Sequence, residues 1–320
     1  MVCVGAPVSL SGRLAMFGAQ VRLGLEVWQR LRPSVDLLIE DDHGEPRSLD
    51  VVLPRLAGRC DLLLGPYSTL LMRRAGDIAT ALDRLIWNHG GAGDDVQTAH
   101  PRHVVSVPTP ASRYAEPFVR HLAETGDRST LRIVHGKGGF ARQAAEGASR
   151  AAHEHGIPVV HGGPVEDGWN LFCAGSFEED VELVKRARHS PAVCAVAAGV
   201  REFASAVDDP RGIYGVGQWF PGGGHHAALG VSEREFVAAY QDRTGEPPSY
   251  PAVQAVAAAI LATHCADLTG GHSRAELRAV VAGLETSTLF GDFAIDPRTG
   301  RQTGHRTVLT RWGEGGPVAV

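Results

Sequence analysis

The most informative part of this sequence is residues 4–18, which read Val-Gly-Ala-Pro-Val-Ser-Leu-Ser-Gly-Arg-Leu-Ala-Met-Phe-Gly. An apolar beginning with β-branched residues runs into a turn of serine and glycine. The apolar residues that follow, Val21, Leu25 and Trp28, have helical spacing. The segment therefore predicts a strand, a tight loop and the start of a helix. Such an arrangement presents free backbone N–H groups and small hydroxyls to a ligand.

Strand-like and helix-like segments alternate through most of the 320 residues. The apolar segments 35–40 and 60–64 predict buried strands, and segments such as 70–82 have the spacing of amphipathic helices. The alternation continues in a second block, where residues 178–188 predict one of the helices. Two such blocks predict an α/β fold with two doubly wound parallel-sheet lobes.

The C-terminal part departs from this alternation. Residues 232–270 are rich in alanine and predict two helices, separated by the Gly/Pro segment 245–251. Residues 307–312 alternate in polarity, which predicts short antiparallel strands. We expect no membrane-spanning helix, because no apolar run approaches the roughly 20 residues that cross a bilayer. Met1 leads straight into the first strand, without the basic and apolar segments of a signal peptide.

Composition and motifs exclude several classes of function. A net charge of −5 argues against nucleic acid or an acidic membrane as a partner. The five cysteines include no CxxC pair and are expected to be structural thiols, and the adjacent His225 and His226 are expected to lie in a solvated loop. Neither a phosphate-binding GxxxxGK[ST] loop nor a GxSxG nucleophile elbow occurs. We therefore expect no metal, no cofactor and no enzymatic activity.

Several short motifs occur together in a characteristic order. They are the opening motif, Asp41-Asp42 followed by a helix, and the segments 60–69, 135–140, 218–221 and 290–305. On these motifs the chain resembles, over nearly its whole length, the type I periplasmic solute-binding proteins of ABC transporters, of the branched-chain amino acid (Leu/Ile/Val) kind. The resemblance implies two lobes joined by a three-strand hinge. The lobes are residues 1–112 plus 228–302, and 113–227 plus 303–320.

The resemblance also implies a mode of action. A small solute binds in the cleft between the lobes, hinge closure traps it, and the subunits of an ABC permease recognise the closed form. The implied location is extracytoplasmic, periplasmic or at the cell surface. The chain as given has no signal peptide, so a cytoplasmic location stays open.

Residues of the first lobe match two ligand-holding loops of that family. Tyr67, Ser68 and Thr69 match the loop that holds a ligand carboxylate, and a hydroxyl beside a helix N-terminus suits an anion. The simpler interpretation is that Ser68 only caps the following helix, and the two roles are compatible. The second loop is matched by residues 88–92, with Gly90, Gly91 and Ala92 as the predicted site residues. The amino acid binders have a threonine in place of Ala92, so one hydrogen bond to the ligand is missing.

Three further residues are assigned by the same resemblance. Phe17 and Phe140 match aromatic residues that close over the ligand from opposite lobes, although either is also compatible with a place in a hydrophobic core. Gln218 falls near a glutamate that faces the ammonium group of bound amino acids. An uncharged residue there favours a carboxylate without an amine, an aromatic acid or an amide. Asp41 and Asp42 are interpreted as ending a strand and capping the next helix, rather than as an acid pair.

The sequence thus predicts the substrate-binding protein of a branched-chain amino acid-type ABC transporter, for a carboxylate-bearing solute such as an amino acid or an aromatic or aliphatic acid. The alternative is a cytoplasmic ligand-sensing regulator of the amide-sensor type on the same fold. An enzyme is a third interpretation, and it requires a catalytic base within reach of Ser68 or Thr69.

Overall fold

The computed structural model describes residues 1–163, 166, 168–187 and 189–320, and it divides the chain into two compact units. Unit 1 comprises Met1–Pro108 and Pro221–His305, and unit 2 comprises Thr109–Phe220 and Arg306–Val320. The chain therefore passes between the units three times. The lobe limits expected from the sequence, at residues 112, 227 and 302, stay a prediction, and the units named below are those of the structure.

Unit 1 contains a parallel sheet of five strands in the order β2-β1-β3-β4-β5. The strands are β1 (Val2–Val8), β2 (Val35–Asp41), β3 (Leu62–Leu64), β4 (Ile86–Asn88) and β5 (Val104–Ser106). Because all five run in the same direction, their carboxyl ends meet at one edge of the sheet, where ligands bind in folds of this class.

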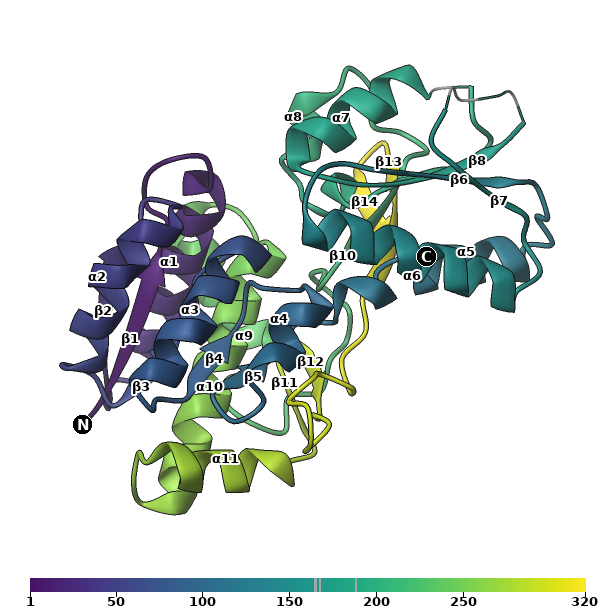
Figure 1. The fold of residues 1–320 in the computed structure, drawn as a ribbon. Coiled ribbons are helices and arrows are strands. Elements are labelled where there is room, and N and C mark those ends of the chain that lie inside the picture. Colours follow the sequence, from purple (N-terminus) through teal and green to yellow (C-terminus); the bar gives the residue numbers. More distant parts are fainter. Residues whose placement is uncertain (164–165, 167, 188) are drawn as a thin grey trace. The chain divides into compact units, whose positions relative to one another are not determined.

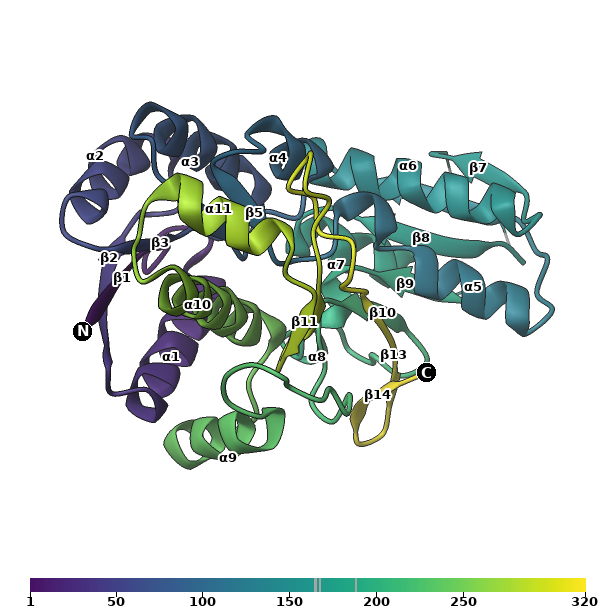
Figure 2. The ribbon, with the colours of Figure 1, turned by 90° about the horizontal axis from the view of Figure 1, so that it is seen from below.

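Helices cover both faces of this sheet. Figures 1 and 2 show α2 and α3 on one face and α1 and α10 on the other. The helices are α1 (Ala15–Leu31), α2 (Pro46–Ala57), α3 (Thr69–Ala81), α4 (Asp94–Ala99), α9 (Glu233–Thr244), α10 (Tyr250–Thr269) and α11 (Arg274–Ala282). A short hairpin, β11 (Thr286–Thr288) and β12 (Gly291–Phe293), completes the unit. This three-layer arrangement confirms the α/β class expected from the alternation of segments.

The opening motif forms the expected strand, loop and helix. In α1 the predicted apolar stripe of Val21, Leu25 and Trp28 is buried. Gly24 lies where α1 meets α10, and a Cβ at this position would come within 2.9 Å of the Ala252 Cβ. The two helices therefore pack at a distance that only glycine permits here.

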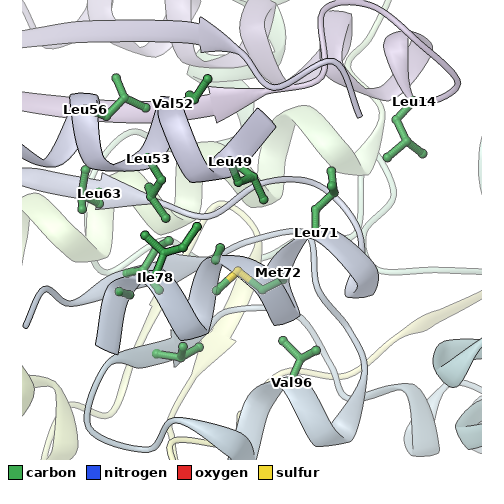
Figure 3. Packing of buried hydrophobic residues seen from close by; sticks show 14 residues of the cluster. Leu14, Leu49, Val52, Leu53, Leu56, Leu63, Leu71, Met72, Ile78 and Val96 are labelled. Carbon is green, nitrogen blue, oxygen red and sulfur yellow. The ribbon is translucent and has the colours of Figure 1, made fainter. Parts of the chain in front are cut away.

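The core between the sheet and its α2/α3 face is built from leucines. Figure 3 shows Leu49, Leu53 and Leu56 of α2 packed with Leu63 of β3 and Met72 of α3. Their side chains are almost completely buried. Burying a leucine side chain contributes roughly 1.5–3 kcal/mol, so this cluster holds α2 and α3 in place. It thereby fixes the loop that begins α3.

Helix α10 corrects one expectation from the sequence. It is 20 residues long and apolar enough, by length and composition, to cross a membrane. It is also a core helix, because 78% of its most apolar window is buried inside the fold. Alanines at seven of its fifteen buried positions let it approach α1 closely. A helix that is apolar on all sides is expected in the middle of a domain of this size.

Unit 2 contains a sheet of seven strands in the order β14-β13-β10-β9-β8-β6-β7. The strands are β6 (Leu131–His135), β7 (Val159–His161), β8 (Asn170–Ala174), β9 (Val193–Ala195), β10 (Tyr214–Gly217), β13 (Val308–Gly313) and β14 (Gly316–Ala319). The first five of these run parallel, and β13 and β14 add antiparallel strands as the C-terminal pattern predicts.

Helices cover both faces of this sheet as well, with α5 and α6 on one face and α7 and α8 on the other (Figure 1). The helices are η1 (Ala111–Arg113), α5 (Glu116–Glu124), α6 (Gly139–Glu154), α7 (Phe177–Arg186), η2 (Ala197–Gly199) and α8 (Phe203–Ala206). Helix α7 matches the helix expected over residues 178–188, although residue 188 lies outside the described part of the chain. Strands β8 and β10 and helices α4 and α11 were not expected.

Candidate functional site

The loop between β1 and α1 is held by two carboxylates at the end of β2. Asp41 accepts hydrogen bonds from the Leu10 N–H at 2.9 Å and the Ser11 hydroxyl at 2.8 Å. Asp42 is fully buried and accepts from the Ser9 hydroxyl at 2.6 Å. The prediction that these aspartates cap the next helix is wrong, because the N-cap of α2 is Glu45. Besides local bonds from the N–H groups of His43 and Gly44, they bind the loop after the neighbouring strand β1, a contact that no local pattern reveals.

The pKa values of the two carboxyls differ because their surroundings differ. Burial raises the pKa of Asp42 above its usual range, and the hydroxyl of Ser9 only partly opposes this effect. Burial acts on Asp41 in the same direction but is outweighed by hydrogen bonds, chiefly from the His43 N–H, so that its pKa is lowered. The loop is therefore fixed by one carboxylate that ionises readily and one that resists ionisation.

The loop before α3 adopts an unusual backbone conformation. Ser68 is the N-cap of α3 and has φ 109° and ψ 151°, a region that glycine occupies freely and other residues rarely do. Its hydroxyl accepts a hydrogen bond from the Leu71 N–H at 3.3 Å, so the expected capping role is confirmed. In unit 2 the N-cap of α6 has nearly the same dihedral angles, φ 104° and ψ 168°, but the residue there is Gly138.

The start of α3 has backbone and hydroxyl donors that are available to a ligand. Of the N–H groups in its first turn, that of Leu71 bonds the Ser68 hydroxyl and that of Met72 bonds the Ser68 carbonyl. Within the described part of the chain, the N–H groups of Thr69 and Leu70 donate to no protein acceptor. The Thr69 hydroxyl accepts from the Gly93 N–H at 3.1 Å and keeps its own proton to donate. These groups, at the positive end of a helix dipole, suit an anion.

The second predicted loop touches the first. The Ser68 N–H donates to the Gly90 carbonyl at 3.2 Å. A Cβ on Gly90 would come within 2.5 Å of the Tyr67 Cα, so only glycine allows this contact. The Asn88 side chain binds both the N–H and the carbonyl of Gly91, at 2.7 and 2.8 Å. Gly91 and Ala92 are both buried.

Aromatic rings flank these loops. Phe17 and Tyr67 stack with their ring centroids 4.8 Å apart and their planes at 17°. The hydroxyl of Tyr67 lies 3.3 Å from that of Tyr250 at the start of α10. Both Phe17 and Tyr67 are partly exposed, so they offer an apolar surface beside the free N–H groups.

The two remaining predicted residues lie in unit 2. Phe140 is partly buried at the start of α6, where it meets Tyr114 edge to face with centroids 5.1 Å apart. Gln218 is buried at the end of β10, and its amide binds the N–H and the carbonyl of Thr109 at 2.9 and 3.1 Å. The same amide also donates to the Tyr114 hydroxyl at 2.5 Å. Both ends of this amide are therefore engaged by the protein.

A buried histidine stands behind the second loop. His89 follows β4 and is fully buried. Burial lowers its pKa from the ordinary 6.5 to about 4, so the imidazole is neutral at physiological pH. A neutral, fully buried imidazole offers a ligand no charged contact.

The structure thus brings together seven of the nine predicted site residues in unit 1. They are Phe17, Tyr67, Ser68, Thr69, Gly90, Gly91 and Ala92. Two contributors had no predicted role: Asn88, which organises the second loop, and Tyr250, whose hydroxyl meets that of Tyr67. An asparagine that ends an apolar strand is a signal for the first. No sequence signal identifies the second, because 183 residues separate the partners.

The described residues contain no group of three or more His, Cys, Asp or Glu side chains placed to hold a metal ion. The chemistry offered at the loops of unit 1 is of another kind. It consists of backbone N–H groups, hydroxyls and two aromatic rings, which are suited to hydrogen bonding and apolar contact with a small molecule.

Comparisons with known proteins give the fold. No protein-family model matches the sequence, and no curated protein sequence matches it significantly. The leucine-binding protein LivK of Thermotoga maritima superposes with a TM-score of 0.86 at 12% identity, over 100% of this chain and 98% of its own. An ABC-transporter solute-binding protein of Rhodopseudomonas palustris in complex with 3,4-dihydroxybenzoic acid gives 0.82 at 15% identity, over 100% and 96%.

The branched-chain amino acid transporter substrate-binding protein LivJ of Streptococcus pneumoniae, in complex with isoleucine, gives a TM-score of 0.80 at 14% identity and covers 100% of both chains. At such identities similarity of structure establishes the fold and leaves the ligand to be argued from the site itself. The chain has the type I periplasmic binding fold of ABC-transporter solute-binding proteins.

Proposed function

We propose that this protein binds a small carboxylate-bearing solute at the loops 67–69 and 90–92 of unit 1 and presents it to the permease of an ABC transporter. In this role it performs no reaction on the solute. Its place of action is extracytoplasmic, where such a protein meets its solute. The ligand-sensing regulator, the alternative expected from the sequence, has no counterpart among the three structures compared and is not proposed.

The observation that carries the proposal is the backbone of Ser68. A non-glycine residue at φ 109° and ψ 151° costs roughly 1–3 kcal/mol, and such strain gathers at functional sites. Gly138 shows that the chain uses glycine for the same conformation in unit 2. A serine in the strained position is explained if its hydroxyl is needed. Capping alone is a weak reason, because glycine is almost as good at an N-cap.

A carboxylate is the ligand group that this loop fits best. The free N–H groups of Thr69 and Leu70 and the hydroxyls of Ser68 and Thr69 are donors, and the dipole of α3 adds positive potential. Charge-assisted hydrogen bonds of this kind are about twice as strong as neutral ones. Isoleucine and 3,4-dihydroxybenzoic acid, which are bound in two of the compared structures, both carry this group.

The body of the ligand is proposed to be apolar and without an ammonium group. The stacked rings of Phe17 and Tyr67 offer a flat apolar surface. None of the nine predicted site residues is acidic, and the Gln218 amide is engaged by Thr109 and Tyr114. An ammonium desolvated without a counter-charge is costly, so aromatic and aliphatic acids are favoured over amino acids.

The test is a thermal-shift and calorimetry screen of the purified protein against matched pairs of compounds. Benzoate and benzamide differ in the carboxylate, and 4-methylpentanoate and leucine differ in the ammonium group. A ligand at about 100 times its dissociation constant adds about 2.7 kcal/mol to the stability. We expect benzoate or 4-methylpentanoate to raise the unfolding midpoint. Binding of benzamide in preference to benzoate would contradict the carboxylate site.

The variant Ser68→Ala/Thr69→Ala locates the binding. Loss of two hydroxyl donors to a charged group should weaken affinity by roughly 2–4 kcal/mol. Ser176→Ala, which removes a comparable N-cap hydroxyl from α7, is the matched control and should leave affinity unchanged.

Contributions of Phe140 and Gln218, and closure of the two units on the ligand, belong to the same proposal. Small-angle scattering with and without the ligand tests closure through the radius of gyration.

A further inference from the structure

Two of the five cysteines lie on neighbouring segments of unit 1. Cys3 is the second residue of β1, and Cys60 precedes β3. The segments run side by side, because the Asp61 N–H donates to the Cys3 carbonyl at 2.9 Å and the Cys3 N–H donates to an Asp61 carboxylate oxygen at 2.8 Å. Cys60 itself is fixed by a hydrogen bond from its N–H to the Leu56 carbonyl, also at 2.8 Å.

The two thiols face the same side of the sheet. Side chains at alternate positions of a strand share a face, so Cys3 points to the side on which a Cβ of Gly5 would lie. The Cys60 Cβ and Sγ both lie 3.2 Å from that Gly5 position. The Cys3 side chain is close enough to contribute to the raised pKa of the Cys60 thiol, after the larger effect of burial. The missing side chain of Gly5 thus leaves space beside the Cys60 sulfur, on the face of the sheet that the Cys3 side chain shares.

A second pair of neighbouring cysteines provides an internal contrast. In the parallel pair β8/β9, Cys173 aligns with Ala195 and Cys194 aligns with Phe172. Cys173 and Cys194 therefore occupy opposite faces of the sheet, although the Cys173 thiol reaches the Cys194 carbonyl at 3.4 Å. Neighbouring strands alone do not allow a disulfide, since its geometry needs the two Cβ atoms on the same side.

We infer that Cys3 and Cys60 form an intramolecular disulfide, which closes when the protein meets a disulfide oxidant. The Cys3 thiolate attacks the oxidant RSSR, forms a mixed disulfide and releases one RS⁻. The Cys60 thiolate then attacks the Cys3 sulfur and releases the second RS⁻. In total two protein thiols lose two protons and two electrons, and RSSR becomes two RSH. The inference does not depend on the proposed ligand.

The order of the two steps follows from exposure. Cys3 is half-buried, whereas Cys60 is buried, so an oxidant reaches Cys3 first. Burial, with a smaller contribution from the neighbouring Cys3, raises the pKa of Cys60 to about 12. The second step is therefore limited by the small fraction of Cys60 thiolate, and it should be faster at about pH 9 than at about pH 7.

The experiment treats the reduced full-length chain with oxidised glutathione, then alkylates the remaining thiols in denaturant and determines the intact and peptide masses. We expect the number of free thiols to fall from five to three, with a cross-link between the peptides of Cys3 and Cys60. Cys60→Ser should keep glutathione on Cys3. Cys173→Ser, the matched control, should form the same cross-link as the unaltered chain.

Three outcomes would overturn the inference. They are five thiols remaining after treatment, a cross-link that involves Cys173, Cys194 or Cys265, and a dimer linked through Cys3 on a non-reducing gel. Thermal unfolding adds a second readout that needs no variant. The oxidised chain should unfold several degrees above the reduced chain, because the disulfide closes a loop of more than 50 residues in the unfolded state.

Discussion

Replacing Ser68 by glycine should separate stability from binding. The strain of φ 109° and ψ 151° costs about 1–3 kcal/mol in serine and almost nothing in glycine. Against this, glycine loses a few tenths of a kcal/mol as an N-cap and gives the unfolded chain about 0.5–1 kcal/mol of extra entropy. Ser68→Gly should therefore be between neutral and about 2 kcal/mol more stable than the unaltered protein without ligand.

Ser68→Ala is the matched comparison. Alanine keeps the backbone strain and loses the hydrogen bond to the Leu71 N–H, which should cost about 1 kcal/mol. The glycine variant should thus exceed the alanine variant by about 1–3 kcal/mol in stability. Both variants lack the hydroxyl, so both should bind a carboxylate ligand more weakly. A protein made more stable and less competent by one substitution is expected where strain serves function.

The reciprocal change in unit 2 tests the same reasoning. Gly138 has φ 104°, and a Cβ there would meet nothing within 4 Å. Gly138→Ala therefore adds backbone strain without a steric clash and should lower stability by about 1–3 kcal/mol. Urea unfolding followed by circular dichroism measures all three variants. Equal stabilities of the two Ser68 variants, together with an unaffected Gly138→Ala, would refute the assignment of strain.

The remaining predictions concern pH and loop contact. Burial raises the pKa of Asp180 in unit 2 from 3.8 to about 7. The free energy of unfolding of unit 2 should therefore fall by up to about 4 kcal/mol as pH rises through that range. Urea unfolding of Asp180→Asn should show no such loss. Burial lowers the pKa of His89 in unit 1 to about 4. The free energy of unfolding of unit 1 should therefore fall by up to about 3 kcal/mol as pH falls from 6.5 to 4. The variant His89→Gln should show no such loss. Hydrogen exchange resolved by unit would show opposite trends, and parallel trends would contradict both assignments. Gly90→Ala, which forces a Cβ to 2.5 Å from the Tyr67 Cα, should reduce ligand binding in calorimetry at least tenfold, whereas Gly283→Ala, with open space around its Cβ, should not.

Sequence patterns predict the parts of this fold that depend on local periodicity. The apolar stripe of α1 and the alternation of strands and helices are such parts, because burial of one face requires a regular spacing. The grouping of the loops 67–69 and 90–92 also follows, since both leave the carboxyl ends of adjacent parallel strands, β3 and β4.

Patterns fail where a tertiary contact decides the role of a residue. Asp41 and Asp42 bind the loop after β1, 30 or more residues away, instead of capping the helix that follows them. Strand β8 begins with Asn170, whose polarity hides a strand that is buried along its whole length. Helix α10 lacks the polar face by which a sequence pattern distinguishes a core helix from a membrane span, because neighbouring elements cover it on most sides.

Gln218 shows how such a contact changes the interpretation of a site. After Ser106 only the Val107 N–H still bonds to β4, through the Asn88 carbonyl. The carbonyls of Val107 and Pro108 and the backbone of Thr109, where the chain first leaves unit 1, need other partners. A buried glutamine binds each of them. Within unit 1, Gln302 donates to the Val107 carbonyl and Gln97 donates to the Pro108 carbonyl. Within unit 2, Gln218 binds both the N–H and the carbonyl of Thr109.

An amide suits this task better than a carboxylate. It donates to a carbonyl and accepts from an N–H at the same time, and it carries no charge that burial would penalise. A glutamate at 218 could accept from the Thr109 N–H but would set a negative charge against the Thr109 carbonyl, now 3.1 Å from the Gln218 amide nitrogen. The residue type at position 218 is thus determined by the Thr109 backbone that its side chain binds. An uncharged residue there follows from the fold, and under the proposed function it supplies no counter-charge for an ammonium group.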